Sequence, residues 1–517
     1  MSQTTAPPPA QGPAADDPAR AWAPAGQALV AALAARLRDP LAGESAGNAA
    51  PGRAWPAPGD IPLDLSAPLP QAGRPADALL DQALPLLLDG LPPPDHPRAL
   101  AHITAPVDPV AVLGSLLAAG LQANLGLRRM AGLACAIEAQ TLAWLAELVG
   151  APALRGGLLL GGGSAAGQTA VWAALARACP GWHEEGLGAR GPRLVAYASA
   201  ASHHWLDRAL RLAGLGARGL RRLPVDAEQR LQPEALARAL AADRRAGRIP
   251  WLLVAHAGTV GSGAVDPLAA LAALARREGL WLHIDGAYGA PYAALRAEPG
   301  GADRLAACGA AALADPDGLN QADSLALDPH KALHQPLGCG ALLLRRPETL
   351  PVAFADAPPY YADAEPAADP APDPSQCGPE NSRPFRALPL WLSLQAAGAQ
   401  GLRASLRAEL DGAAALRAAL HASPAFVCGP GALGVQTFRP REGGEAAVGR
   451  LLARLRADGH AALSAVRLAG PDETTPAADA PRWLRACVVQ GRGSAAERLA
   501  RLPAELAARL DPGTVGD

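Results

Sequence analysis

Lys331 is the only lysine in a chain of 517 residues in which lysine and arginine together number 46. It lies in the stretch "SLALDPHKALHQP", which begins at Ser324. A guanidinium group is effectively never deprotonated, whereas a lysine amine in a suitable environment loses its proton and acts as a nucleophile. Schiff-base chemistry with a carbonyl compound needs such an amine. The presence of a single lysine indicates this role, although one lysine could also have been retained by chance.

Asp285 ends the apolar run "LWLHID". A buried carboxylate is costly unless a cation or a strong hydrogen-bond donor lies beside it. A pyridinium nitrogen is such a partner, and a protonated ring nitrogen makes a pyridoxal ring an electron sink. A carboxylate that caps a helix or binds a local arginine is equally compatible with this segment. Ala287 faces the same side two residues later and is small enough to lie against a flat ring.

Two further stretches carry polar residues just after apolar runs. In "GGGSAAGQTA", residues 161–170, glycines and Ser164 stand before a helical pattern, where free backbone amides bind phosphate. Such a turn is often only structural, and no GK[ST] follows, so it is not a Walker loop. In "YASAASHHW", residues 197–205, His203 could stack on a ring or exchange protons. A structural histidine explains this stretch too.

The elements that must position these residues are short apolar runs that alternate with amphipathic helical patterns. We predict strands at 157–161, 193–198, 251–257, 280–285, 324–327 and 340–346, and helices at 233–245 and 266–279. This alternation predicts an α/β fold with a mostly parallel sheet and helices on both faces. Ligands bind at the carboxyl ends of the strands in such sheets, where the polar residues above lie.

The rest of the chain divides by composition. Residues 1–20 are rich in Pro and Ala and predict a disordered tail, and residues 21–95 predict an N-terminal helical arm. Residues 96–354 form the predicted large domain. Residues 355–384 are crowded with Pro and Asp, which is typical of a linker or a mobile lid. Residues 385–517 predict a small C-terminal α+β domain.

Charge and cysteine content exclude several classes of function. The net charge of −2 is spread along the chain, so we expect no nucleic-acid or anionic-membrane partner. The seven cysteines are scattered without CxxC spacing, which argues against disulfides and a metal site and favours the reducing cytoplasm. No apolar run reaches the roughly 20 residues that a membrane span needs, and no secretory signal is visible.

Taken in order, these stretches resemble the group II pyridoxal-phosphate (PLP) dependent amino-acid decarboxylases, which include the aromatic, glutamate, histidine and diaminobutyrate enzymes. The other matching segments are "AHAGTVGSGAVDPL", "SRPFRALPLWLSLQAAG", "HPRALAHITAP" and "RWLRACVV". The resemblance spans about residues 90–490. The His-Lys pair followed by Gln-Pro and Cys-Gly is its most specific part. It implies a fold type I PLP-dependent transferase-like architecture with a seven-stranded sheet, and a homodimer.

The resemblance also implies a role for each matching residue. Lys331 would form the Schiff base with PLP, and Asp285 would bind the pyridinium nitrogen. His203 would stack on the ring, with Ala287 on its other face. The phosphate would be held by Gly163, Ser164, Ala165 and His330. Tyr360 occupies the place of the family's lid tyrosine, the proton donor, which makes residues 355–384 the predicted active-site lid.

The sequence departs from the family in places that bear on the substrate. Ala165 and Gly167 replace the acidic and amide residues of the usual phosphate loop, and Ala332 replaces a common aromatic after the lysine. "HPRALAHITAP" is more similar to the diaminobutyrate-type or acidic branch than to the aromatic branch. With only four Phe and five Tyr, an aromatic pocket is harder to build. The sequence therefore predicts decarboxylation of an aliphatic amino or acidic substrate such as 2,4-diaminobutyrate.

Other functions remain compatible with the sequence. An aromatic-L-amino-acid decarboxylase, an aminotransferase, a carbon-carbon lyase or an oxidative aldehyde synthase would keep Lys331 and Asp285. The tyrosine at 360 favours decarboxylation among these. A degenerate, non-catalytic relative is the alternative outside catalysis.

Overall fold

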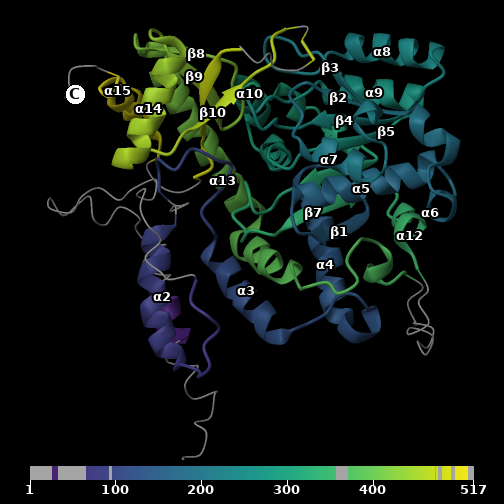
Figure 1. The fold of residues 1–517 in the computed structure, drawn as a ribbon, viewed down its shortest axis with the longest axis horizontal. Coiled ribbons are helices and arrows are strands. Elements are labelled where there is room, and N and C mark those ends of the chain that lie inside the picture. Colours follow the sequence, from purple (N-terminus) through teal and green to yellow (C-terminus); the bar gives the residue numbers. More distant parts are fainter. Residues whose placement is uncertain are drawn as a thin grey trace, which may run out of the picture.

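A computed structural model describes residues 26–32, 66–91, 96–356, 371–471, 473–474, 480–490 and 495–510. Figure 1 shows a larger body built on one sheet, a smaller body at the C-terminal end, and helix α2 beside them. The predicted tail, residues 1–20, lies outside the described residues. Within the predicted arm, residues 26–32 are helical and α2 covers Ala76–Gly90.

The large sheet has seven strands in the order β1-β7-β6-β5-β4-β2-β3. The strands are β1 Gly156–Leu160, β2 Leu194–Ser199, β3 Leu220–Leu223, β4 Ile249–His256, β5 Trp281–Asp285, β6 Ser324–Leu327 and β7 Gly340–Leu344. Strand β7 is antiparallel to both β1 and β6, and the other pairs are parallel. The predicted mostly parallel seven-stranded sheet is confirmed. Strand β3 was not predicted, because "LRRL" has no apolar run.

Helices cover both faces of this sheet, so its strands are apolar over most of their length. Leu158 and Leu160 pack with α5 (Gly163–Ala178) and α7 (Trp205–Leu212), whereas Leu159 packs with α4 (Arg128–Leu148) on the opposite face. Side chains alternate across a strand, and this alternation divides the core into two layers. The predicted helices at 233–245 and 266–279 are confirmed as α8 Pro233–Arg245 and α9 Leu268–Glu278.

Further helices complete the large body. They are α3 Pro109–Leu121, α6 Trp182–Glu185, α10 Gly301–Ala307, α11 Pro316–Asn320 and α12 Thr349–Phe354. No helix among the described residues is both long and apolar enough to cross a membrane.

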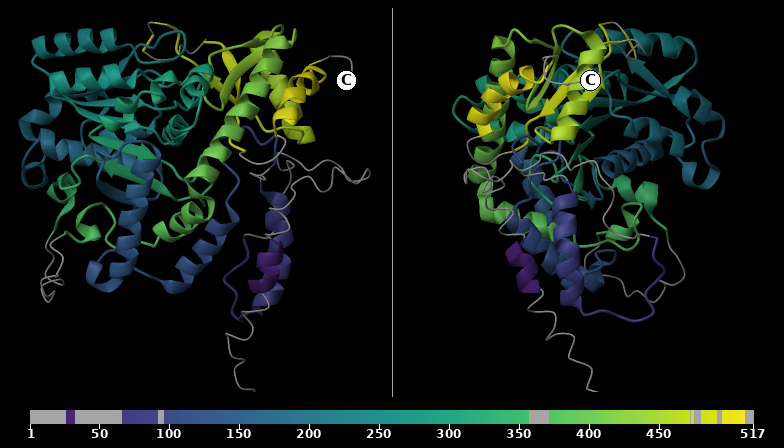
Figure 2. Two further views of the ribbon diagram at one scale, coloured as in Figure 1. Left: turned by 180° about the vertical axis from the view of Figure 1, so that it is seen from behind. Right: turned by 60° about the vertical axis from the view of Figure 1, so that its left-hand side comes forward.

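The C-terminal body contains a four-stranded antiparallel sheet in the order β10-β11-β9-β8. Its elements are α13 Ala387–Ala422, β8 Phe426–Cys428, β9 Val435–Pro440, α14 Gly444–Asp458, β10 Ser464–Arg467, β11 Arg482–Cys487 and α15 Ala495–Ala507. Helix α13 packs on α15 at one end and on α3 and α4 at the other, so it joins the two bodies. Figure 2 shows this helix between them.

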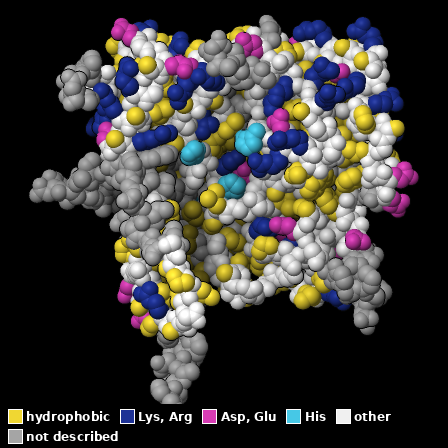
Figure 3. Space-filling model, viewed as in Figure 1, with side chains coloured by type: hydrophobic (Ala, Val, Ile, Leu, Met, Phe, Trp, Pro, Cys, Tyr) yellow, Lys and Arg dark blue, Asp and Glu magenta, His cyan; other side chains and the backbone are white. Residues whose placement is uncertain are grey.

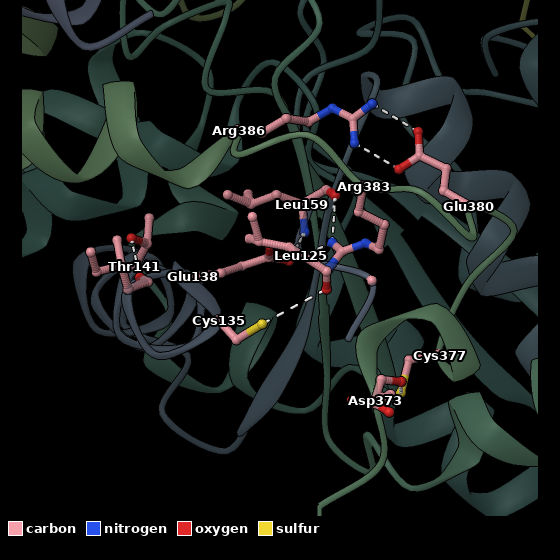
Figure 4. Close-up of polar contacts among 12 residues, drawn as sticks. Leu125, Cys135, Glu138, Thr141, Leu159, Asp373, Cys377, Glu380, Arg383 and Arg386 are labelled. Atoms are coloured by element: carbon pink, nitrogen blue, oxygen red, sulfur yellow. Dashed lines mark hydrogen bonds and ion pairs between the residues drawn. The ribbon is translucent and has the colours of Figure 1, made fainter. Parts of the chain in front are cut away.

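A buried ion pair anchors the chain just before α13. Arg383 is 2% exposed, and its Nη2 donates to Glu138 Oε1 over 2.6 Å and to the Leu159 carbonyl over 3.1 Å. The Leu159 amide donates to the same Glu138 oxygen over 3.0 Å. Figure 4 shows this group beside the partly exposed pair of Arg386 and Glu380. The buried pair therefore connects residues 371–384 to α4 and β1.

The two ion pairs allow a matched test. Arg383→Leu leaves the Glu138 carboxylate buried without its cation, so we expect it to lower the free energy of unfolding by about 3–5 kcal/mol. Arg386→Leu breaks a partly exposed pair and should lower it by less than about 1 kcal/mol. Urea unfolding of both variants measures the difference. Equal losses would contradict the assigned burial.

A second buried polar group lies in the sheet. The imidazole Nδ1 of His283 is 2.8 Å from the Ser324 hydroxyl, which also accepts the Trp281 indole N–H over 2.8 Å. Burial lowers the pKa of His283 to about 4. The imidazole is therefore neutral at neutral pH.

This histidine predicts an acid-sensitive fold. Between pH 6.5 and 4 the unfolded chain binds a proton on His283 that the folded chain does not bind, so stability falls as the pH falls. Over the full window the loss is about 3 kcal/mol. Urea unfolding between these pH values should give a flatter profile for His283→Asn than for the parent chain. An identical pH dependence of stability in the two proteins would contradict this prediction.

Candidate active site

A cavity of about 480 Å³ lies at the carboxyl ends of β1, β2, β4, β5 and β6. Figure 3 shows imidazole and basic side chains gathered around a hollow near the middle of one face of the molecule. Seven of the predicted site residues line the cavity: Gly163, Ser164, His203, Asp285, Ala287, His330 and Lys331. Ala165 follows them in α5 without lining the cavity, and Tyr360 lies outside the described residues.

Lys331 follows β6, and a carboxylate fixes its amine. Its Nζ lies 2.9 Å from Oδ2 of Asp328, which is buried. His330 Nε2 lies 3.7 Å from the same oxygen, and His330 Nδ1 donates to the Cys339 carbonyl over 2.8 Å. The lysine amine thus occupies a defined position at the cavity wall.

Asp285 ends β5 and is 8% exposed. Its Oδ2 accepts the Trp205 indole N–H over 2.7 Å, and its Oδ1 accepts the Ala287 amide over 3.2 Å. Burial alone would raise its pKa, but His256, the Trp205 N–H and Lys331 outweigh burial and hold the pKa of Asp285 below its usual value. The carboxylate is therefore an ionised group at the cavity wall, which suits a pyridinium nitrogen.

His203 follows β2 and presents a neutral imidazole. The backbone N–H of Trp205 donates to His203 Nδ1 over 3.2 Å, so the proton of the neutral ring lies on Nε2. Burial, together with the neighbouring His204, lowers the pKa of His203. A neutral flat ring at this position can pack on an aromatic cofactor without repelling a ring cation.

The turn from β1 into α5 fits a phosphate. The first N–H groups of a helix have no partner within the helix, and they attract anions. A Cβ atom at Gly163 would lie 2.7 Å from Asp328 Oδ2 and 3.1 Å from Ala287 Cβ, so the close approach of this turn to the cavity wall requires glycine. An amine, an anion, a flat imidazole and a helix start in one cavity together fit PLP.

Sequence reasoning missed several residues that line the same cavity: His102, Trp205, His256, Asp328 and Arg485. Trp205 and Asp328 lie in the same stretches as the predicted residues His203 and Lys331. Their place just after a strand was a signal that could have identified them. His256 is the last residue of β4, and its backbone N–H and Nδ1 both contact Asp266 Oδ2, at 2.8 and 3.3 Å. Burial lowers the pKa of His256, but Asp266 outweighs burial and raises it.

The chain matches a known protein family over most of its length. The model of the pyridoxal-dependent decarboxylase conserved domain matches residues 58–439. An aromatic-L-amino-acid decarboxylase of Bacillus atrophaeus is 34% identical over 67% of this chain and 68% of its own length. An L-2,4-diaminobutyrate decarboxylase of Rhizobium meliloti is 31% identical over 74% of this chain and 70% of its own length.

Solved structures have the same fold. Oryza sativa TDC with PLP and tryptamine superposes with a TM-score of 0.81 and 24% identity, covering 97% of this chain and 99% of the other. Mouse CSAD gives a TM-score of 0.78 and 23% identity, covering 94% and 99%. The predicted fold class is thus confirmed. The chain belongs to the pyridoxal-dependent decarboxylase family and is a PLP-dependent amino-acid decarboxylase.

Proposed function

We propose that the protein decarboxylates an L-amino acid whose short aliphatic side chain ends in a charged group. The cavity lining carries this proposal, because neither large aromatic ring in it is available to a substrate. The Trp205 indole N–H donates to Asp285. The Tyr288 side chain is buried, and its hydroxyl accepts the Gly434 amide over 2.8 Å. The remaining apolar lining residues are Ile103, Val260, Ala287 and Leu337.

Arg485 favours an acidic substrate within this class. The residue is 9% exposed, and its guanidinium donates to the carbonyls of Val260 and Ala101 over 2.7 and 2.9 Å. No carboxylate pairs with it among the described parts of the chain. A buried cation without a counter-ion is costly, so a substrate carboxylate would stabilise it. The second candidate, 2,4-diaminobutyrate, is favoured by the relative from Rhizobium meliloti.

In this proposal each site residue has its own role in binding the cofactor. Lys331 would carry the cofactor, and Asp328 Oδ2, 2.9 Å from Nζ, would orient the amine. Asp285 keeps a proton on the ring nitrogen. His203 and Ala287 hold the ring between them. The phosphate is bound by Gly163, Ser164, Ala165 and His330.

Bound PLP supplies an electron sink for the electron pair that remains when CO2 departs. Tyr360 or His203 then returns a proton to the substrate's α-carbon. The neutral His203 carries its proton on Nε2, which is the atom that would donate it. In this proposal the segment around Tyr360, which lies outside the described residues, would close over the cavity and exclude water from this step.

The lysine gives the first test. The purified protein with PLP should show the visible absorbance band of a lysine–pyridoxal linkage, and Lys331→Ala should lose both the band and CO2 release. Lys331→Arg is the matched control, because it keeps the positive charge without an amine nucleophile. We expect it to fail equally. A band that persists in Lys331→Arg would refute the covalent role.

The substrate gives the second test. CO2 release should be faster from L-aspartate, L-glutamate, L-cysteine sulfinate or 2,4-diaminobutyrate than from L-tyrosine or L-tryptophan. Arg485→Met should raise KM for an acidic substrate by about tenfold or more, because a charge-assisted hydrogen bond is lost. Its effect on 2,4-diaminobutyrate should be smaller, and Arg485→Lys should retain part of the preference. Preferred turnover of an aromatic amino acid would overturn the proposal.

A further inference from the structure

Trp205 contacts two of the groups that form the cofactor site. Its indole Nε1 donates to Asp285 Oδ2 over 2.7 Å, and its backbone N–H donates to His203 Nδ1 over 3.2 Å. The residue is 5% exposed and begins α7, so its backbone is held by the helix that follows. One residue therefore orients both the carboxylate and the imidazole of the predicted site.

The indole leaves the Asp285 carboxylate able to bind a further donor. A carboxylate has about four lone-pair positions. The Trp205 N–H and the Ala287 amide occupy one position on each oxygen. Because these two donors fix the carboxylate plane, the direction in which a third donor can approach is fixed as well.

Gly167 provides the space that the indole occupies. A Cβ atom at position 167 would lie 2.6 Å from Cη2 and Cζ3 of Trp205 and 2.8 Å from its Cζ2. Gly167 lies inside α5, where glycine is less favourable than alanine by about 1 kcal/mol. The cost of glycine at this position is explained by the close contact with the ring.

His283 supports the indole from the sheet. Its ring centroid lies 5.7 Å from that of Trp205, with an interplanar angle of 83°. The Ser324 hydroxyl fixes the His283 ring through Nδ1 over 2.8 Å. The indole is thus packed between α5 and β5, with its N–H directed at Asp285.

We propose that Trp205 is a positioning residue of the cofactor site, whose indole N–H fixes the Asp285 carboxylate for the ring nitrogen of PLP. Gly167 is glycine because that indole fills the space of a side chain. The inference rests on the proposed role of Asp285. It concerns PLP binding and the protonation of Asp285, so it can be tested without measuring catalysis.

The test uses Trp205→Phe, which keeps an aromatic ring and removes the N–H. The dissociation constant of PLP, measured on the apoenzyme by equilibrium dialysis, should rise roughly tenfold, because one charge-assisted hydrogen bond to the carboxylate is lost. The loss of this donor also raises the pKa of Asp285. When the pH is lowered, PLP binding to the variant should therefore begin to weaken at a higher pH than PLP binding to the parent protein. His203, His256, His283 and Lys331 face Asp285 and are unchanged in this variant.

Trp251→Phe is the matched control. Trp251 is 4% exposed and packs in the same core layer, and its indole N–H has no hydrogen-bond partner among the described residues. The same substitution there should leave the affinity for PLP and its pH dependence unchanged. Equal effects of the two variants would overturn the inference.

Gly167→Ala tests the packing independently of the N–H and remains informative if Trp205→Phe does not fold. The added methyl group displaces the ring, so PLP binding should weaken as it does in Trp205→Phe. In the Trp205→Phe background, Gly167→Ala should raise the dissociation constant of PLP by less than about a further twofold, because phenylalanine lacks the outer ring atoms that contact position 167. Full additivity of the two losses would refute the assigned contact.

Asp285→Asn separates the inference from the proposed function. If Asp285→Asn weakens PLP binding and Trp205→Phe does not, the role of Trp205 is wrong and that of Asp285 stands. If Asp285→Asn leaves PLP binding unchanged, both are wrong.

Discussion

At the end of β5 the Asp285 carboxylate is almost fully removed from water, and an ion in that position is stable only among donors and cations. Its partners come from three separate elements. Trp205 lies at the start of α7, His256 at the end of β4, and Lys331 in the turn after β6. The parallel register places His256 directly beside Asp285, because the two strands end at the same level. The electrostatics of the site therefore depend on the strand order of the sheet.

Burial and polar partners shift the pKa values of three nearby histidines in different directions. Burial dominates at His283 and lowers its pKa to about 4, and it also lowers the pKa of His203. His256 is equally buried, but the Asp266 carboxylate reverses the effect and raises its pKa. One residue type thus provides an imidazole whose pKa is lowered, at His203, and another whose pKa is raised, at His256 beside Asp285.

The cavity also depends on the C-terminal body. Arg485 lies in β11 of the small sheet, yet its guanidinium bonds to Val260 and Ala101 of the large body and lines the cavity. These bonds fix the position of the small sheet against the site, since a guanidinium offers donors in a rigid planar fork. Helix α13 also joins the two bodies, because it packs on α15 and on α3 and α4. The lining of the cavity is consequently shared between the two bodies.

The sequence by itself determined the periodic elements and the residues whose chemistry is rare. Runs such as 324–327 and 340–344 are apolar because both sheet faces are covered. Asp285 ends a strand, and Lys331 lies in the turn after one. Strand β3 escaped prediction because it is short and polar. Only the tertiary structure decided the parts played by Trp205 and Arg485, since their partners lie 80 and 225 residues away. Local sequence encodes propensity and burial, whereas the partner of a long-range hydrogen bond is set by how the elements pack.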